Sequence, residues 1–113
     1  MDLIDKTTFD ELRDTAGPEF VAELVATFLE EAPAMLADLR SARAAGDADV
    51  FRRAAHSLKS NSATFGAMGV SLLARRLELE GLATDASRDA AAIDALEAAY
   101  QRAAAALQEL ARG

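Results

Sequence analysis

The sequence predicts an all-α protein, an antiparallel four-helix bundle with a short additional N-terminal helix. Alanine accounts for 28 of the 113 residues, while aromatic residues make up only 5% of the chain, and this composition favours closely packed helices over strands. Apolar residues recur at the period of amphipathic helices along most of the chain. The breaks between these segments are short, so consecutive helices should lie antiparallel. We expect one domain over residues 1–113.

The N-terminal part is predicted to form a short helix followed by a long one. Thr8 and Glu11 have the spacing of a capping box, and Gly17-Pro18 ends the first helix and begins the next. The second helix is predicted from about Pro18 to Ala45. Its apolar phase continues across Pro33, so we expect a single helix bent at the proline. Its predicted inward-facing residues are Val21, Leu24, Val25, Phe28, Leu36 and Leu39.

A third helix follows immediately. Gly46 ends the long helix and Asp47 is a predicted N-cap, because a carboxylate there accepts a backbone N–H of the first turn. This helix should run to about Phe65, where Gly66 offers a break.

The last two helices complete the bundle. One is predicted from about Ala67 to Gly81, and after a loop at Ala83 to Ala86 the other is predicted to be capped by Ser87. Their predicted inward-facing residues are Val70, Leu73 and Leu77, then Ile93, Leu96, Tyr100, Leu107 and Leu110.

Composition excludes several function classes. Without cysteine there is no disulfide scaffold, zinc finger or thiol nucleophile. A net charge of −7 argues against binding to nucleic acid or to a membrane surface. The start of the chain has no leader pattern, and no stretch approaches the roughly 18 apolar residues of a membrane span. We therefore expect a soluble, cytoplasmic protein.

The positive charges of this acidic chain are unevenly distributed. From Val50 to Leu77 there is no Asp or Glu. That segment contains the only histidine and five cations: His56, Arg52, Arg53, Lys59, Arg75 and Arg76.

His56 is predicted to lie on the exposed face of the third helix. At about 100° per residue, His56 falls about 140° away from the apolar stripe that includes Phe51 and Leu58. The residues near it on that face are Arg52, Arg53, Lys59, Ser60 and, one turn further on, Ala63. An exposed imidazole among cations suits a histidine that accepts a phosphoryl group, because cations stabilise the bound anion.

Other chemistries lack their motifs in this chain. A metal site needs several ligating side chains, and His56 stands among cations instead. There is no Gly-x-Ser-x-Gly nucleophile turn and no glycine-rich phosphate loop with its lysine. We therefore expect no ATP site and no autokinase activity.

The residues from His56 onward resemble a family signature. The segment His56-Ser-Leu-Lys-Ser-Asn-Ser-Ala-Thr-Phe-Gly-Ala67 is similar to the pattern His-x-Leu-Lys-Gly-x-Ser-x-x-x-Gly-Ala of histidine-containing phosphotransfer (HPt) domains. It agrees at six of the seven fixed positions, and the predicted layout of helices agrees over nearly the full chain. The resemblance implies a bundle whose histidine carries a phosphoryl group between receiver-domain aspartates in a multistep phosphorelay.

The resemblance also implies roles for single residues. His56 would be the phosphorylation site, and Lys59 would help to hold the phosphoryl group. Ser60 stands where the family commonly has glycine, which leaves room for the receiver's backbone, so we expect Ser60 to narrow partner choice or to slow transfer. The positions implied to serve in packing and in the turn are Leu58, Ser62 and Gly66.

The implied partners are response-regulator receiver domains and a hybrid histidine kinase. The receiver would bring Mg²⁺, and this chain, expected to be a monomer, would need no cofactor of its own. Arg52 and Arg53 would steer a receiver's acidic pocket. Apolar contacts near His56 are expected at Ala63 and Met68, whereas Phe65 is expected in the core.

Hairpin geometry singles out one acid. If the third and fourth helices turn near Ala67, the residue level with His56 is eleven positions past the turn, Glu78. We hypothesise that Glu78 accepts a hydrogen bond from Nδ1–H of His56 and leaves Nε2 as the nucleophile. The alternatives are a solvated Glu78 or a pair between Glu78 and Arg75.

Two other functions remain open at this point. One is a helical interaction module that binds receivers or kinases without carrying phosphate, whose function would survive His56→Gln. The other is a dimerising kinase domain that phosphorylates its own histidine, for which the chain lacks room for an adjoining ATP-binding domain.

Overall fold

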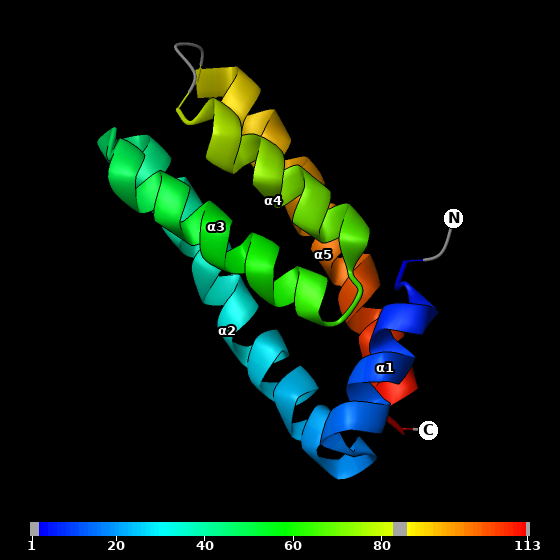
Figure 1. Ribbon diagram of the computed structural model, residues 1–113. Helices are drawn as coiled ribbons and strands as arrows, with labels where there is room; N and C mark the ends of the chain where they lie inside the picture. Colours follow the sequence, from blue (N-terminus) through cyan, green and yellow to red (C-terminus); the bar gives the residue numbers. More distant parts are fainter. Residues whose placement is uncertain (1–2, 83–85, 113) are drawn as a thin grey trace.

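The computed structural model describes residues 3–82 and 86–112, which form five helices and no strand (Figure 1). This confirms the predicted all-α fold class. The helices are α1 (Lys6–Ala16), α2 (Pro18–Ala45), α3 (Ala48–Thr64), α4 (Met68–Glu80) and α5 (Ala86–Arg112). Within these residues, no helix combines the length and the hydropathy needed to cross a lipid bilayer.

The four later helices form the bundle, and α1 completes one end of it. Within the bundle, each helix packs against two of the other three, in the cyclic order α2, α3, α4, α5. At about 1.5 Å per residue, α2 and α5 are each roughly 40 Å long, while α3 and α4 are much shorter. The α3–α4 hairpin therefore leaves part of α2 uncovered, and α1 packs there against α2 and α3 (Figure 1).

The start of α1 is fixed by a backbone contact with the α3–α4 turn. The N–H of Asp5 donates to the carbonyl of Gly66 over 2.8 Å, and α1 begins at the next residue, Lys6. The capping box predicted at Thr8 and Glu11 is therefore wrong. Thr8 lies inside the first turn, and its hydroxyl donates to the Asp5 carboxylate over 2.6 Å.

Pro33 lies within α2, which continues through it as one helix, as predicted. Proline has no N–H, so the carbonyl of Leu29, four residues earlier, lacks its usual helical donor. The hydroxyl of Tyr100 on α5 donates to this carbonyl over 3.3 Å. The gap that Pro33 leaves in the helix is thus filled from the neighbouring helix.

The α2–α3 junction has the predicted caps. Gly46 adopts the left-handed conformation with φ of 70°, and the Asp47 side chain accepts a hydrogen bond from the N–H of Val50. At α5 the predicted cap is wrong, because the helix already includes Ala86 and Ser87 lies within its first turn. Of the loop predicted at Ala83 to Ala86, residues 83–85 lie outside the described residues.

The core agrees closely with the predicted apolar faces. Of the predicted inward-facing residues, Leu24, Leu73 and Leu110 are half-buried and the others are buried. One ion pair is also largely buried: Asp89 on α5 is 4% exposed and lies 3.1 Å from the guanidinium of Arg43 on α2. This pair and the Tyr100 contact both join α2 to α5.

Candidate functional site

The apolar stripe of α3 turns His56 toward solvent. Phe51, Ala55 and Leu58 are fully buried, and they anchor one side of the helix to the core. His56 lies on the other side, with 59% of its side chain exposed. The stripe exists because its residues recur at helical spacing, so the same pattern that builds the core also presents the imidazole.

The register of the α3–α4 hairpin is set near its turn. Gly66, with φ of 82°, adopts the left-handed conformation between the two helices. On α4, the hydroxyl of Ser71 donates to the backbone carbonyl of Lys59 over 3.1 Å. Two helical turns after Ser71, Glu78 lies on the same side of α4 and therefore also faces α3.

Glu78 contacts both of the site residues that the sequence placed on α3. Its Oε2 lies 2.5 Å from Nδ1 of His56, and its Oε1 accepts a hydrogen bond from Nζ of Lys59 over 2.5 Å. The carboxylate therefore lies where the hairpin argument placed it, and within the described residues its partners are His56 and Lys59 rather than Arg75. The three side chains form a compact cluster between α3 and α4.

The charge of Glu78 determines which ring nitrogen of His56 carries the hydrogen. The Lys59 ammonium lowers the pKa of the Glu78 carboxyl, partial burial opposes this effect, and the bond from His56 adds to it. An ionised carboxylate can only accept hydrogen bonds, so Nδ1 of His56 carries the hydrogen. In the neutral ring, Nε2 is then the nitrogen with the free lone pair, on a side chain that is 59% exposed.

The two predicted steering arginines are paired within α3. Arg52 and Arg53 each lie 3.1 Å from a carboxylate oxygen of Asp49, and all three side chains are well exposed. Asp49 stands one residue before the acid-free segment and three and four residues before the arginines. This helical spacing was the signal that sequence reasoning missed.

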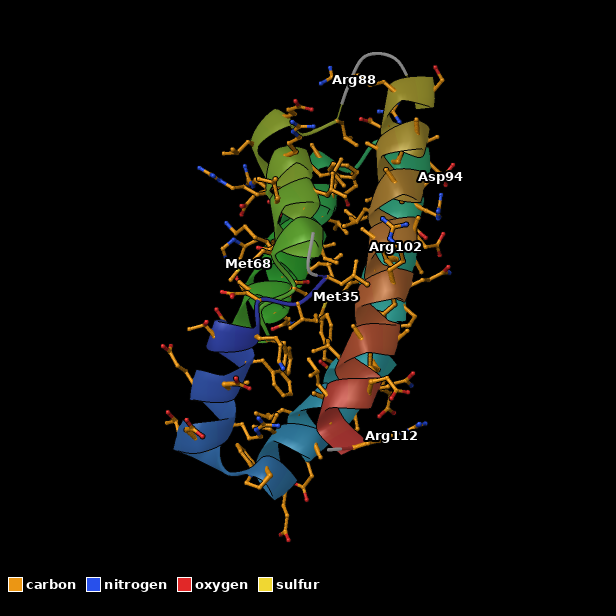
Figure 2. The ribbon with its side chains drawn as sticks, turned by 90° about the vertical axis from the view of Figure 1, so that its right-hand side faces the viewer. Met35, Met68, Arg88, Asp94, Arg102 and Arg112 are labelled. Atoms are coloured by element: carbon orange, nitrogen blue, oxygen red, sulfur yellow. The ribbon has the colours of Figure 1, made fainter. Side chains whose placement is uncertain are left out.

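The remaining predicted contact residues differ in exposure. Ser60 is exposed and Ala63 is half-buried on the face that presents His56. Phe65 is buried and contacts Phe28, with ring centroids 5.3 Å apart, so it belongs to the core as expected. Met68 is 45% exposed and lies on the outer side of the α3–α4 hairpin (Figure 2). A groove of about 410 Å³ lies between α2 and α3, lined by Met35, Asp38, Val50, Arg53, Ala54 and Ser57.

Comparison with known proteins decides the family. The model of the Hpt domain matches residues 23–111 of this chain. The chain belongs to the Hpt domain family. The fold agrees with the crystal structure of histidine-containing phosphotransfer protein B (HptB) from Pseudomonas aeruginosa PAO1, with a TM-score of 0.84. The two chains share 24% sequence identity over 97% of this chain and 95% of that chain, and no curated protein matches this sequence.

Two features of this Hpt domain were not anticipated from its sequence. Ser71 donates a hydrogen bond to the backbone of α3 at Lys59. The sequence feature that could have predicted this contact is the position of Ser71 two turns before Glu78, on the same side of α4. Lys59 is engaged by Glu78 rather than extended toward solvent, with 27% of its side chain exposed. The cation and the imidazole of the site thus share one carboxylate.

Proposed function

We propose that this Hpt domain carries a phosphoryl group on Nε2 of His56, received from the aspartate of one receiver domain and passed to another. The observation that carries the proposal is the contact between Nδ1 of His56 and Glu78 beneath an exposed ring. It gives the nucleophilic nitrogen a defined lone pair and an open approach.

The transfer step is a displacement at phosphorus. The lone pair of His56 Nε2 attacks the phosphorus of an aspartyl phosphate, the Nε2–P bond forms, and the P–O bond breaks with its electrons left on the receiver's carboxylate. The hydrogen on Nδ1 stays in place, so the phosphorylated ring is cationic and the Glu78 carboxylate stabilises it. In the onward step an aspartate of the second receiver attacks phosphorus, and the neutral ring leaves.

Lys59 and the receiver's Mg²⁺ supply positive charge to the transferred group. The carboxylate of Glu78 contacts both Nζ of Lys59 and the ring of His56. Nζ is therefore close enough to the ring to turn toward the phosphoryl oxygens. Mg²⁺ is expected on the receiver, where carboxylates hold it, and this chain contributes the nucleophile and its orientation. No ATP enters either step.

The test is phosphoryl transfer from a panel of phosphorylated receiver domains to the wild-type chain and to His56→Gln. Acid-labile, alkali-stable phosphate on the wild type, and none on His56→Gln, is the expected result. Arg102→Gln, an exposed cation on α5, serves as the control and should accept phosphate like the wild type. A folded wild type that accepts phosphate from no receiver would overturn the proposal and favour a binding module without phosphate.

A further inference from the structure

Helix α4 presents an apolar face to solvent. Leu72 and Leu79 are 55% and 71% exposed, and Met68 is 45% exposed. At about 100° per residue, these three side chains and Arg75 fall within an arc of roughly 60°, opposite the buried Val70 and Leu77. We refer to Met68, Leu72, Arg75 and Leu79 as the α4 outer face.

This face adjoins the cluster of His56, Lys59 and Glu78. Ser71 and Glu78 both reach α3, and Arg75 lies between them on α4, rotated from their line by only about 40–60°. The axes of packed helices are about 8–10 Å apart, so the α4 outer face begins one helix away from His56. A standard interface of about 800 Å² per partner is roughly 30 Å across. A partner centred on His56 therefore reaches this face.

The charges on α4 favour an acidic partner. Both acids of the helix are engaged, Glu78 by Lys59 and His56 and Glu80 by Arg88. Within the described residues, by contrast, Arg75 and Arg76 pair with no carboxylate.

The arginines of α3 differ from those of α4. Arg52 and Arg53 share the single carboxylate of Asp49, which offsets one of their two positive charges. The two arginines of α4 have no such partner within the described residues, so α4 carries more uncompensated positive charge than the Arg52–Arg53 region, on the opposite side of His56 from the α2–α3 groove.

We propose that the α4 outer face is part of the surface on which the receiver docks, and that it recognises apolar and acidic side chains around the phosphorylated aspartate. The inference rests on the proposed function, which supplies a partner whose Mg²⁺ site is necessarily rich in carboxylates. A second copy of this chain fits poorly, because a symmetric contact would place the two Arg75 side chains against each other.

The test compares transfer from a phosphorylated receiver with direct chemical phosphorylation. The variant Leu72→Glu/Leu79→Glu should lose about ten-fold or more in the second-order rate of transfer. The variant loses the apolar contacts of the two leucines, and its new glutamates repel the acids of the partner, so both changes weaken docking. Arg75→Glu should lose more than Arg75→Gln. Phosphorylation of His56 by phosphoramidate, which needs no docking, should be unchanged in all three variants.

A matched control separates docking from a general effect of a new surface charge. Phe20 is 52% exposed on the first turn of α2, away from the site, and Phe20→Glu should transfer like the wild type. Equal transfer by Leu72→Glu/Leu79→Glu and by the wild type would overturn the inference and leave the proposed function intact. A wild-type chain that takes phosphate from phosphoramidate but from no receiver would overturn both.

Discussion

Ion pairs join α2 to α5 and α3 to α4, but their members differ in exposure. Between α2 and α5, Asp89 is 4% exposed and contacts Arg43. Between α3 and α4, Glu78 holds a histidine that is 59% exposed. A buried charge that loses its partner destabilises a fold, whereas an exposed pair contributes little to stability. The comparison indicates that the Asp89–Arg43 pair serves stability, while His56 in the α3–α4 cluster is available for chemistry.

The largest effect on stability is expected at Asp89. Asp89→Asn removes the charge that Arg43 faces, and should lower the free energy of unfolding by about 3 kcal/mol, as measured by urea denaturation. Phosphorylation of His56 should not change below the unfolding transition. Asp94→Asn is the control, because Asp94 is 68% exposed in its pair with Arg40 and should change stability by less than about 1 kcal/mol. Equal losses from the two variants would contradict the comparison.

The stability of the α3–α4 pair is expected to depend on its turn rather than on its charged cluster. Gly66 has φ of 82°, and a Cβ there would lie 2.7 Å from the carbonyl oxygen of Asp5. Gly66→Ala should therefore cost about 2 kcal/mol of unfolding free energy. Gly69→Ala, where a Cβ meets nothing within 4 Å, should be neutral or slightly stabilising. A Gly66→Ala variant as stable as the wild type would show that stability does not depend on the conformation of this turn.

The sequence predicts the apolar faces and the register of the hairpin better than it predicts individual polar contacts. The exposed position of His56 and the approach of Glu78 both follow from helical period and turn position. The start of α1 does not, because a backbone bond to Gly66, distant in sequence, sets it. The contact of Tyr100 with Leu29 spans 71 residues and depends on how two long helices align. Local pattern carries no information on that alignment.

Glu78 should affect transfer without affecting the fold. Glu78→Gln keeps the shape of the side chain but loses the charge that, in the proposed function, stabilises the phosphorylated ring, so transfer to and from His56 should slow by about ten-fold. The unfolding midpoint at neutral pH should hardly change. The ¹⁵N shifts of the imidazole should report a mixture of tautomers in place of hydrogen on Nδ1 alone. An unchanged tautomer together with an unchanged transfer rate would show that Glu78 neither orients the ring of His56 nor assists transfer.

A smaller effect is expected where Tyr100 compensates for Pro33. Tyr100→Phe leaves the carbonyl of Leu29 without its donor and should cost about 1 kcal/mol in thermal or urea unfolding. In a Pro33→Ala background the new N–H can donate to that carbonyl, so the same change should cost much less. A double-mutant cycle measures the difference. Equal costs in both backgrounds would mean that the hydroxyl acts independently of the proline.

The smallest effect is a pH dependence of stability specific to the α3–α4 cluster. Lys59 and His56 lower the pKa of Glu78 below the ordinary carboxyl value of 4.5, so the folded chain binds this proton more weakly than the unfolded chain does. The resulting stabilisation is complete above the unfolded pKa and is lost as pH falls through the folded pKa. The free energies of unfolding of the wild type and of Glu78→Gln, measured by urea denaturation, should therefore differ by a small, constant amount at neutral pH and begin to converge as pH falls below about 4.5. Because the cluster lies at the surface, with His56 59% exposed, the change should be much smaller than the loss from Asp89→Asn. A larger change would place the charges of α3–α4 among the groups that hold the bundle together.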